Sequence, residues 1–353
     1  MDNNEIVSII IPAYNAAEYI TETVQSAMAS SYPYLEIIIV NDGSTDDTQL
    51  IINQITTLHP EIKSFSQANQ GVSVARNFAI SKSNGNYILP LDADDLISPD
   101  YIEKAVEVLK KDEDVVLVYG EAKYFGKKTG KWKLPEFSLY KLARRNIIYV
   151  SGIYRKKDFL NTEGYCKQLK GREDWDFWIS LLKKGGKVVK LDFTCFYYRI
   201  TTNSKRARTK NLKKEIVDEL NIRHKPFFYR LLNGKLHHQR THSRKMNNFI
   251  HFFFPENIFV NQAYTNYEDL VYIANENTSA KEMYLNESTY NVKFTNFSET
   301  HFHFPGTKIT KSIARDLFEQ NPTNDNVVYL GYYEQQTSFF TLKSYLITLE
   351  KIV

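Results

Sequence analysis

The sequence predicts an α/β protein with a mostly parallel β-sheet, and three observations lead to this fold class. Short apolar runs bounded by turn residues recur through about the first 120 residues, as expected of strands that are buried on both faces. Between these runs, apolar residues recur three or four positions apart, which is typical of amphipathic helices. Strand and helix therefore alternate, and this order places helices on both faces of a parallel sheet.

The expected elements follow one another along the chain. The apolar runs predict strands at residues 7–11, 37–40, 87–91 and 115–119. The helical spacing predicts helices whose apolar faces fall within residues 20–28, 48–55 and 102–109. Ser44 is expected to cap the second of these helices, since a serine hydroxyl can accept from the free backbone N–H groups of a helix start.

A further helix is predicted at residues 173–182, where Trp175 and Leu182 belong to one apolar stripe and two glycines follow at 185 and 186. Two strand-like segments come next, at residues 187–191 and 196–200. The recognisable α/β pattern ends there.

The character of the chain changes at residue 205. Residues 205–245 carry thirteen lysines and arginines against three acids, a local net charge of +10, and aromatic residues continue to 254. Two interpretations are open: rings and cations that meet an anionic membrane surface, or a helical connector whose rings pack inside the protein. We expect a main α/β domain at 1–204, a basic aromatic helical connector at 205–255, and a small α+β region of unknown role at 256–353. A helical piece is expected near residues 313–320.

Composition narrows the class of protein. The 353 residues suffice for one large domain or two, and 42% hydrophobic with 24% charged residues exclude collagen-like, disordered and disulfide-rich classes. A net charge of +4 is too small to indicate nucleic acid as a partner. Two cysteines build neither a disulfide framework nor a structural zinc site. With no basic leader and no run of about 20 apolar residues, we expect a cytoplasmic protein.

Polar loops follow the expected strands, and parallel α/β sheets bind ligands at the carboxyl ends of their strands. Asp92-Ala93-Asp94-Asp95 comes directly after a buried strand, where carboxylates at i and i+2 can hold a divalent cation that bridges phosphates. The plainer interpretation is an acidic loop that caps the next helix. Three neighbouring acids favour the cation, because they repel one another unless a cation or hydrogen-bond donors balance them.

Three further positions have a chemical and a plainer interpretation. Asp42, after the second strand, can accept from an N–H of a bound ring, or it can belong to an Asp-Gly turn. Arg76, in the first turns of a helix, can clamp phosphates or lie on the surface. Glu173 and Asp174 begin a helix beside tryptophans, where one carboxylate can act as a general base or both can simply complement the helix dipole.

Five segments together carry a family resemblance: VSIIIPAYNAAEYI, IIIVNDGSTDDT, QGVSVARN, GNYILPLDADD and GREDWDFWISLLKKG. In this order they resemble the family-two inverting glycosyltransferases of the GT-A fold, over residues 5–200. The resemblance implies a Rossmann-like, mostly parallel sheet with a helical and mixed C-terminal extension. It fades beyond residue 205, and the place of the family's closing loop holds Arg199 and Lys205 but no histidine.

The resemblance also implies roles for single residues. Those that match the nucleotide site are Pro12, Ala13 and Tyr14 around the nucleoside, Asp42 on the base, Arg76 near the nucleotide, Asp92 on the ribose side, and Ala93. Asp94 would hold Mn²⁺ or Mg²⁺ on the diphosphate. Asp174, of the catalytic pair Glu173 and Asp174, would be the base that deprotonates the acceptor hydroxyl.

By this resemblance, the protein is a metal-dependent glycosyltransferase that moves a hexosyl or N-acetylhexosaminyl group from a nucleotide sugar, expected to be a UDP-sugar. The expected acceptor is a saccharide or lipid-linked saccharide of bacterial surface-polysaccharide synthesis. We expect no nucleic-acid partner, and a peripheral contact of residues 205–254 with the inner face of the membrane stays open, as does oligomerisation. Two alternatives remain: a nucleotidyltransferase, and a nucleotide- or carbohydrate-binding module without catalysis.

Overall fold

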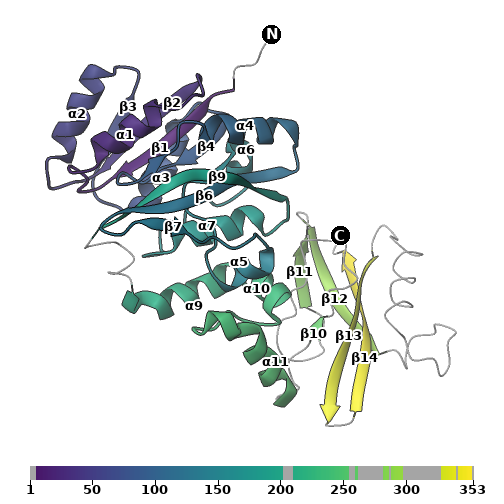
Figure 1. Cartoon of the computed structure of the whole chain (residues 1–353). Coiled ribbons are helices and arrows are strands. Elements are labelled where there is room, and N and C mark those ends of the chain that lie inside the picture. The colour runs from purple at the N-terminus through teal and green to yellow at the C-terminus, as the bar shows by residue number, and fades with distance from the viewer. Residues whose placement is uncertain are drawn as a thin grey trace. The chain divides into compact units, whose positions relative to one another are not determined.

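The computed structural model describes residues 5–201 and 210–253, together with five strand segments at 259–260, 281–285, 288–296, 327–338 and 341–351. The expected helical piece at 313–320 and Lys205 lie outside these described residues. The chain divides into two compact units, residues 1–220 and 221–353, each of which is described by itself (Figure 1).

The first unit is built on one mixed sheet with the order β3-β2-β1-β4-β8-β6-β9-β5, and β7 pairs with β6. Its strands are β1 (Val7–Ala13), β2 (Leu35–Asp42), β3 (Lys63–Gln67), β4 (Tyr87–Pro90), β5 (Leu96–Ile97), β6 (Val115–Gly126), β7 (Gly130–Trp132), β8 (Ile153–Arg155) and β9 (Lys187–Ile200). The strands β1 to β4 pair in parallel, β8 runs antiparallel between β4 and β6, and β9 is parallel to β6. The predicted α/β class is therefore confirmed: the sheet is parallel from β3 through β2 and β1 to β4 and again between β6 and β9, and mixed around β8, β7 and β5.

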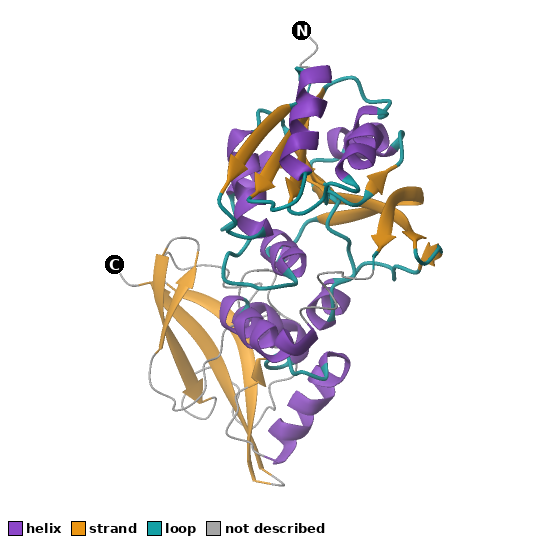
Figure 2. Cartoon of the chain, turned by 90° about the vertical axis from the view of Figure 1, so that its left-hand side faces the viewer, coloured by secondary structure: helices purple, strands orange, loops and turns teal. Residues whose placement is uncertain are grey.

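Helices lie on both sides of this sheet (Figure 2). They are α1 (Ile20–Met28), α2 (Thr48–Leu58), α3 (Val72–Lys82), α4 (Tyr101–Lys111), α5 (Leu139–Arg144), α6 (Lys156–Leu160) and α7 (Glu173–Leu182). All seven residues of β1 are buried, as a central strand covered on both faces requires. In α4, the residues of the predicted apolar face are buried together with Tyr101, and the remaining residues are partly or fully exposed, which fits an amphipathic helix.

Three local predictions were wrong or incomplete. Strand β3 has the sequence KSFSQ and lies at the sheet edge with its residues partly exposed, so it shows no apolar run. β9 is one strand of 14 residues where two were expected. Ser44 does not cap α2, which begins at Thr48 after Asp47; its hydroxyl instead donates to Asn41 Oδ1 at 2.6 Å.

The second unit contains helices followed by an antiparallel sheet. Helix α9 (Lys213–Arg223) spans the boundary between the units, and α10 (Lys225–Leu232) and α11 (Ser243–Phe253) follow it. The sheet has the order β10-β13-β14-β12-β11, with strands at Phe259–Val260, Val327–Ser338, Thr341–Lys351, Ser288–Asn296 and Lys281–Leu285. Phe227 and Phe228 of α10 are buried, whereas Phe249 is 64% exposed. None of the helices that the structure describes is both long enough and apolar enough to span a bilayer.

Candidate functional site

The loops that follow β1 and β2 are joined by hydrogen bonds, because parallel neighbours end at the same edge of the sheet. The backbone N–H of Asn15 donates to Ser44 Oγ at 3.0 Å, and the backbone N–H of Thr45 donates to Asn15 Oδ1 at 2.8 Å. Pro12 and Ala13 are buried at the end of β1, and the next residue, Tyr14, is 45% exposed. The ring of Tyr14 is thus presented at the carboxyl edge of the sheet.

Asp42 ties the end of β2 to the loop before α3. Its carboxylate is buried and accepts from Gln67 Nε2 at 2.8 Å and from the backbone N–H groups of Gln70 and Gly71 at 2.9 and 2.8 Å. Gly43 follows with φ at +69°, and a Cβ atom there would lie 2.6 Å from the backbone nitrogen of Asn69. Only glycine fits this turn, so the Asp-Gly pair both makes the turn and fixes the carboxylate.

Arg76 is the centre of a buried ion network. Its side chain is 2% exposed, and its guanidinium contacts Asp92 Oδ1 at 2.5 Å and Glu173 Oε1 at 3.3 Å, while lying 5.2 Å from the ring centroid of Tyr165. Burial alone would lower the pKa of Arg76, but the charges of Asp92 and Glu173 raise it above its usual value. The interpretation of Arg76 as a surface arginine is therefore wrong. The network joins the loop after β4 to the first residue of α7.

Arg199 at the end of β9 holds the acidic loop in place. Its backbone N–H donates to Asp95 Oδ1 at 2.8 Å, and its Nε donates to the backbone oxygen of Asp94 at 2.7 Å. The guanidinium lies over the rings of Tyr19 and Phe125, at 4.7 and 4.2 Å from their centroids. These contacts favour a positioning role for Arg199.

The carboxylate of Asp94 carries unbalanced negative charge. Burial and the neighbouring charge of Asp92 raise the pKa of Asp94 to about 6. Ala93 between them is buried. Among the described residues, no group of three or more His, Cys, Asp or Glu side chains is arranged to hold a metal. A single hard carboxylate with excess negative charge nevertheless fits Mg²⁺ or Mn²⁺, because such ions commonly take one or two carboxylates and complete their shell with phosphate and water.

Asp174 occupies the first turn of α7. Its Oδ2 accepts from Asn146 Nδ2 at 2.5 Å, and the adjacent Trp175 donates from Nε1 to the backbone oxygen of Leu142 at 2.7 Å. Burial, reinforced by the charge of Glu173, raises the pKa of Asp174 to about 6. Asn146 was not predicted as a site residue, because it belongs to no motif and lies 28 positions from its partner.

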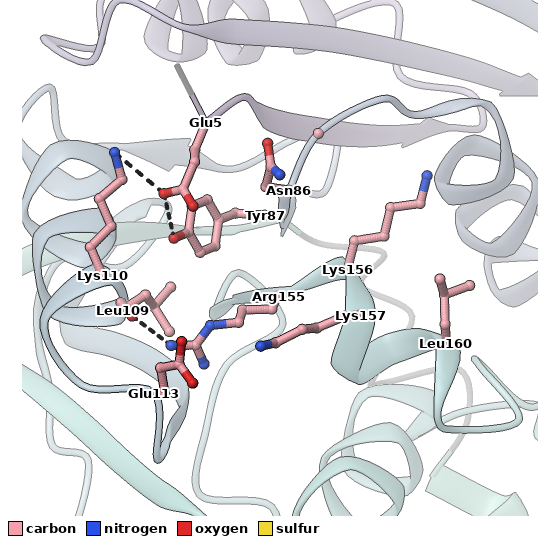
Figure 3. Close-up of a pocket in the computed structure, with 11 residues that line it drawn as sticks. Glu5, Asn86, Tyr87, Leu109, Lys110, Glu113, Arg155, Lys156, Lys157 and Leu160 are labelled. Carbon is pink, nitrogen blue, oxygen red and sulfur yellow. Dashed lines mark hydrogen bonds and ion pairs between the residues drawn. The ribbon is translucent and has the colours of Figure 1, made fainter. Parts of the chain in front are cut away.

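A pocket of about 580 Å³ lies elsewhere in this unit, at the end of the sheet where β1 and β4 begin (Figure 3). Within it, Glu5 contacts Lys110 at 3.3 Å and accepts from the Tyr87 hydroxyl at 2.8 Å. Arg155 donates to the backbone oxygens of Leu109 and Asp112, at the C-terminus of α4, and to that of Val115. Lys110 thus pairs with a carboxylate, and Arg155 binds carbonyl groups at the end of α4. The loops at Tyr14 and Asp42 follow the opposite ends of the strands.

Replacing Arg155 with methionine is expected to destabilise the fold. The change removes the donor from two buried backbone oxygens and one partly buried backbone oxygen, which costs about 2 kcal/mol in free energy of unfolding. Urea unfolding followed by circular dichroism measures this difference. The exposed Lys157, two residues further on, gives the matched control, and Lys157→Met should stay within about 0.5 kcal/mol of the parent. Equal unfolding midpoints for the two variants would contradict the capping role.

Known proteins resemble this chain in sequence and in fold. Residues 8–170 match the family model described as Glycosyl transferase family 2. The chain is 33% identical over 195 residues to the chondroitin synthase of Pasteurella multocida, an alignment that covers 54% of this chain and 20% of that protein. It is 32% identical over 203 residues to TuaG of Bacillus subtilis, a glycosyltransferase named for teichuronic acid biosynthesis, covering 56% of this chain and 81% of TuaG.

Solved structures share the architecture. Residues 1–349 of S. aureus TarS in complex with UDP-GlcNAc superpose with a TM-score of 0.54 at 19% identity, covering 71% of this chain and 73% of that one. The complex of the same TarS fragment with UDP gives a TM-score of 0.51 at 22% identity, covering 70% and 72%. The chain spans only a fifth of the length of the chondroitin synthase, so that relative contains much sequence with no counterpart here.

Proposed function

The chain belongs to glycosyl transferase family 2, and we propose that it transfers a sugar from a nucleoside-diphosphate donor to a saccharide acceptor with inversion at the anomeric carbon. The observation that carries this proposal is the ion network of Arg76. It joins Asp92, beside the expected metal ligand Asp94, to Glu173, beside the expected base Asp174. One buried cation thus holds the donor side and the acceptor side of the site together.

In the proposed reaction, Asp174 takes the proton of an acceptor hydroxyl. The hydroxyl oxygen then bonds to the anomeric carbon as the bond from that carbon to the diphosphate breaks, and attack from the opposite face inverts the configuration. A pKa raised to about 6 makes Asp174 a better base than an ordinary aspartate, while most of its carboxyl groups are still ionised at neutral pH. Asn146 orients the carboxylate, and the bonds of Glu173 to Arg76 suit a positioning role for Glu173.

For the donor, we propose that Pro12, Ala13 and Tyr14 line the nucleoside pocket and that Asp42 binds the base. A carboxylate offers about four acceptor positions, of which Asp42 uses three for the protein, so that one remains for an N–H of the base. TarS has been solved with UDP and with UDP-GlcNAc, which supports a UDP-sugar as the first donor to test. Asp92 would face the ribose, and Ala93 would also contact the nucleotide.

Asp94 would hold Mn²⁺ or Mg²⁺ at the diphosphate. When bound, such an ion would stabilise the negative charge of the leaving diphosphate. We expect UDP-sugar hydrolysis and transfer to stop in EDTA and to return with Mn²⁺ or Mg²⁺, and Asp94→Asn to require a higher metal concentration. Full activity in EDTA would overturn the metal assignment. Nucleotide binding without hydrolysis or transfer, whatever metal is supplied, would favour the binding-module alternative.

The pH dependence of turnover tests the base. Asp174 must be ionised to accept a proton, and its pKa lies at about 6, so kcat should fall as pH drops through about 6 and level off above about 7. An ordinary aspartate would place this decline about two pH units lower. Initial rates at saturating donor and acceptor, from pH 4.5 to 8.5, measure the acid limb. A flat profile down to pH 5 would contradict the assignment.

The expected division at residues 204 and 255, and a cytoplasmic location with peripheral membrane contact through 205–254, remain proposals. Phe227 and Phe228 are buried and take no part in such a contact, which leaves exposed side chains such as Phe249 and the lysines and arginines. Flotation with anionic liposomes, before and after neutralising the charges of 205–245, tests it; unchanged binding would refute it.

A further inference from the structure

A second cluster of cations and rings lies in the first unit, on the β6–β7 hairpin and α5. Residues 121–145 contain six lysines and two arginines against two glutamates, a net charge of +6 that exceeds the +4 of the whole chain. We call residues 121–145 the basic hairpin. Its cations are Lys123, Lys127, Lys128, Lys131, Lys133, Lys141, Arg144 and Arg145.

Three aromatic rings pack together where the basic hairpin meets β9. Trp132 of β7 stacks on Tyr124 of β6 with a centroid distance of 5.3 Å and an interplanar angle of 18°. Tyr198 of β9 lies 5.4 Å from Trp132 and 6.3 Å from Tyr124. All three rings are partly exposed. Rings held in this way lose little freedom when a ligand binds, so they form a preorganised apolar platform for the C–H face of a sugar.

Cations surround this platform. Lys128 Nζ lies 5.3 Å from the ring centroid of Tyr124, and Lys127 and Lys133 are exposed on either side of the turn. Lys131 is paired with Glu121 at 2.6 Å, which accounts for one of the two acids. The remaining positive charge is complementary to a ligand that carries carboxylate or phosphate groups.

The platform is joined to the candidate site through the chain segment that carries Asn146. Tyr198 immediately precedes Arg199 on β9, but successive side chains of a strand point to opposite faces, so that Tyr198 lies beside Trp132 and Arg199 lies over Phe125. On the face of the platform, the ring centroids of Trp132 and Tyr149 are 6.4 Å apart, and Tyr149 lies three residues after Asn146, the partner of Asp174. A ligand on the platform would therefore approach the site from the side of Asn146 and Asp174.

We propose that the basic hairpin and Tyr198 form the acceptor subsite, and that the acceptor is an anionic oligosaccharide whose sugar ring packs on Trp132 while its acidic groups contact Lys127, Lys128 and Lys133. This inference rests on the proposed function, since it names the acceptor class of the same site. Carboxylates and phosphates both offer negatively charged oxygens to the lysines. The experiment distinguishes them by using one probe of each kind.

Tryptophan fluorescence reports on this surface directly. The chain has three tryptophans, of which Trp175 and Trp178 are fully buried and Trp132 is partly exposed. The full chain, without donor, is titrated with a hyaluronan hexasaccharide, a glycerol-phosphate hexamer and neutral chitohexaose. We expect at least one anionic probe to change the emission, to bind about tenfold more tightly than chitohexaose, and to weaken as NaCl rises from about 0.05 to about 0.5 M.

Two variants and a matched control complete the test. Trp132→Phe should remove the emission change, and replacing Lys127, Lys128 and Lys133 together with glutamine should weaken the anionic probe by about tenfold in calorimetry. Glutamine at three exposed lysines of α4, Lys104, Lys110 and Lys111, removes the same charge elsewhere in the unit and should leave binding unchanged. Thermal melts establish that the variants are folded.

Three outcomes would overturn the proposal: no emission change with either anionic probe, an affinity for chitohexaose equal to that for the anionic probes, or an affinity for the anionic probe that is the same in the triple lysine variant as in the parent. An emission change with phosphatidylglycerol vesicles alone would instead assign the surface to a membrane and also overturn it. None of these measurements needs the donor or Asp174. Loss of donor hydrolysis with intact oligosaccharide binding would count against the proposed function and not against the acceptor subsite.

Discussion

Replacing Asp174 with asparagine is expected to lower kcat for sugar transfer by about a thousandfold while leaving the Kd for the nucleotide donor nearly unchanged. Asparagine keeps the size of the side chain and can still pair with Asn146, but it cannot take the acceptor proton, and a general base contributes about 10²–10⁴ to a rate. Transfer is measured at saturating substrates, and donor binding by calorimetry with UDP. Asp192→Asn, at an exposed position on β9, is the matched control and should retain full activity. An Asp174→Asn enzyme with normal turnover would remove Asp174 from the mechanism.

Asn146→Ala tests whether Asn146 acts through the ionisation of Asp174 or only supports the structure of the site. Asn146 donates to Asp174 and so favours its ionised form; without that donor, the pKa of Asp174 should rise further. The acid limb of the pH profile should therefore move to higher pH, whereas a purely structural defect would lower kcat at every pH alike.

Replacing Arg76 with methionine is expected to cost about 3–5 kcal/mol in free energy of unfolding and to abolish transfer. The change leaves Glu173 buried and Asp92 partly buried without their shared cation, and a buried ion pair that loses one partner is strongly destabilising. Urea unfolding of the full chain gives the free energy. Arg145→Met removes an exposed arginine of the same unit and is the control for stability, since it should change the free energy of unfolding little.

Neutralising Asp92 and Glu173, the partners of Arg76, shows whether the loss of stability in Arg76→Met comes from charge or from packing. If the cost arises from uncompensated carboxylates, adding Asp92→Asn and Glu173→Gln to Arg76→Met should restore part of the stability, because the network couples the three residues. A triple variant no more stable than Arg76→Met would mean that the lost packing of Arg76 against Tyr165 dominates.

The sequence predicted those parts of the fold that depend on local patterns. Strands such as β1 and β2 are apolar runs, and the order of strand and helix was enough for the parallel sheet. Strand β3 was not predicted, because an edge strand that is partly exposed needs no apolar run. Ser44 was misplaced because its hydroxyl binds Asn41, three residues away, in a turn that serves the loop and not the helix.

The candidate site shows the same limit more sharply. Motifs indicated Asp42, Asp94 and Asp174, but no local pattern predicts that Arg76 is buried between residues 92 and 173. The partnership of Asn146 with Asp174 likewise depends on the folded chain. The basic hairpin was overlooked because its charge is balanced elsewhere in a chain whose total is only +4.

The buried network has a consequence for electroneutrality at the site. Five carboxylates, at 92, 94, 95, 173 and 174, stand against three guanidiniums, those of Arg76, Arg172 and Arg199. With all groups ionised, their charges sum to −2; burial raises the pKa of Asp95 well above its usual value, and with Asp95 protonated the sum is still −1. A diphosphate adds more negative charge to a partly dehydrated space. If the proposed function holds, free nucleotide should be repelled, and the donor should enter already complexed with its divalent ion. Donor affinity should then follow the concentration of the metal–nucleotide complex and not that of total nucleotide.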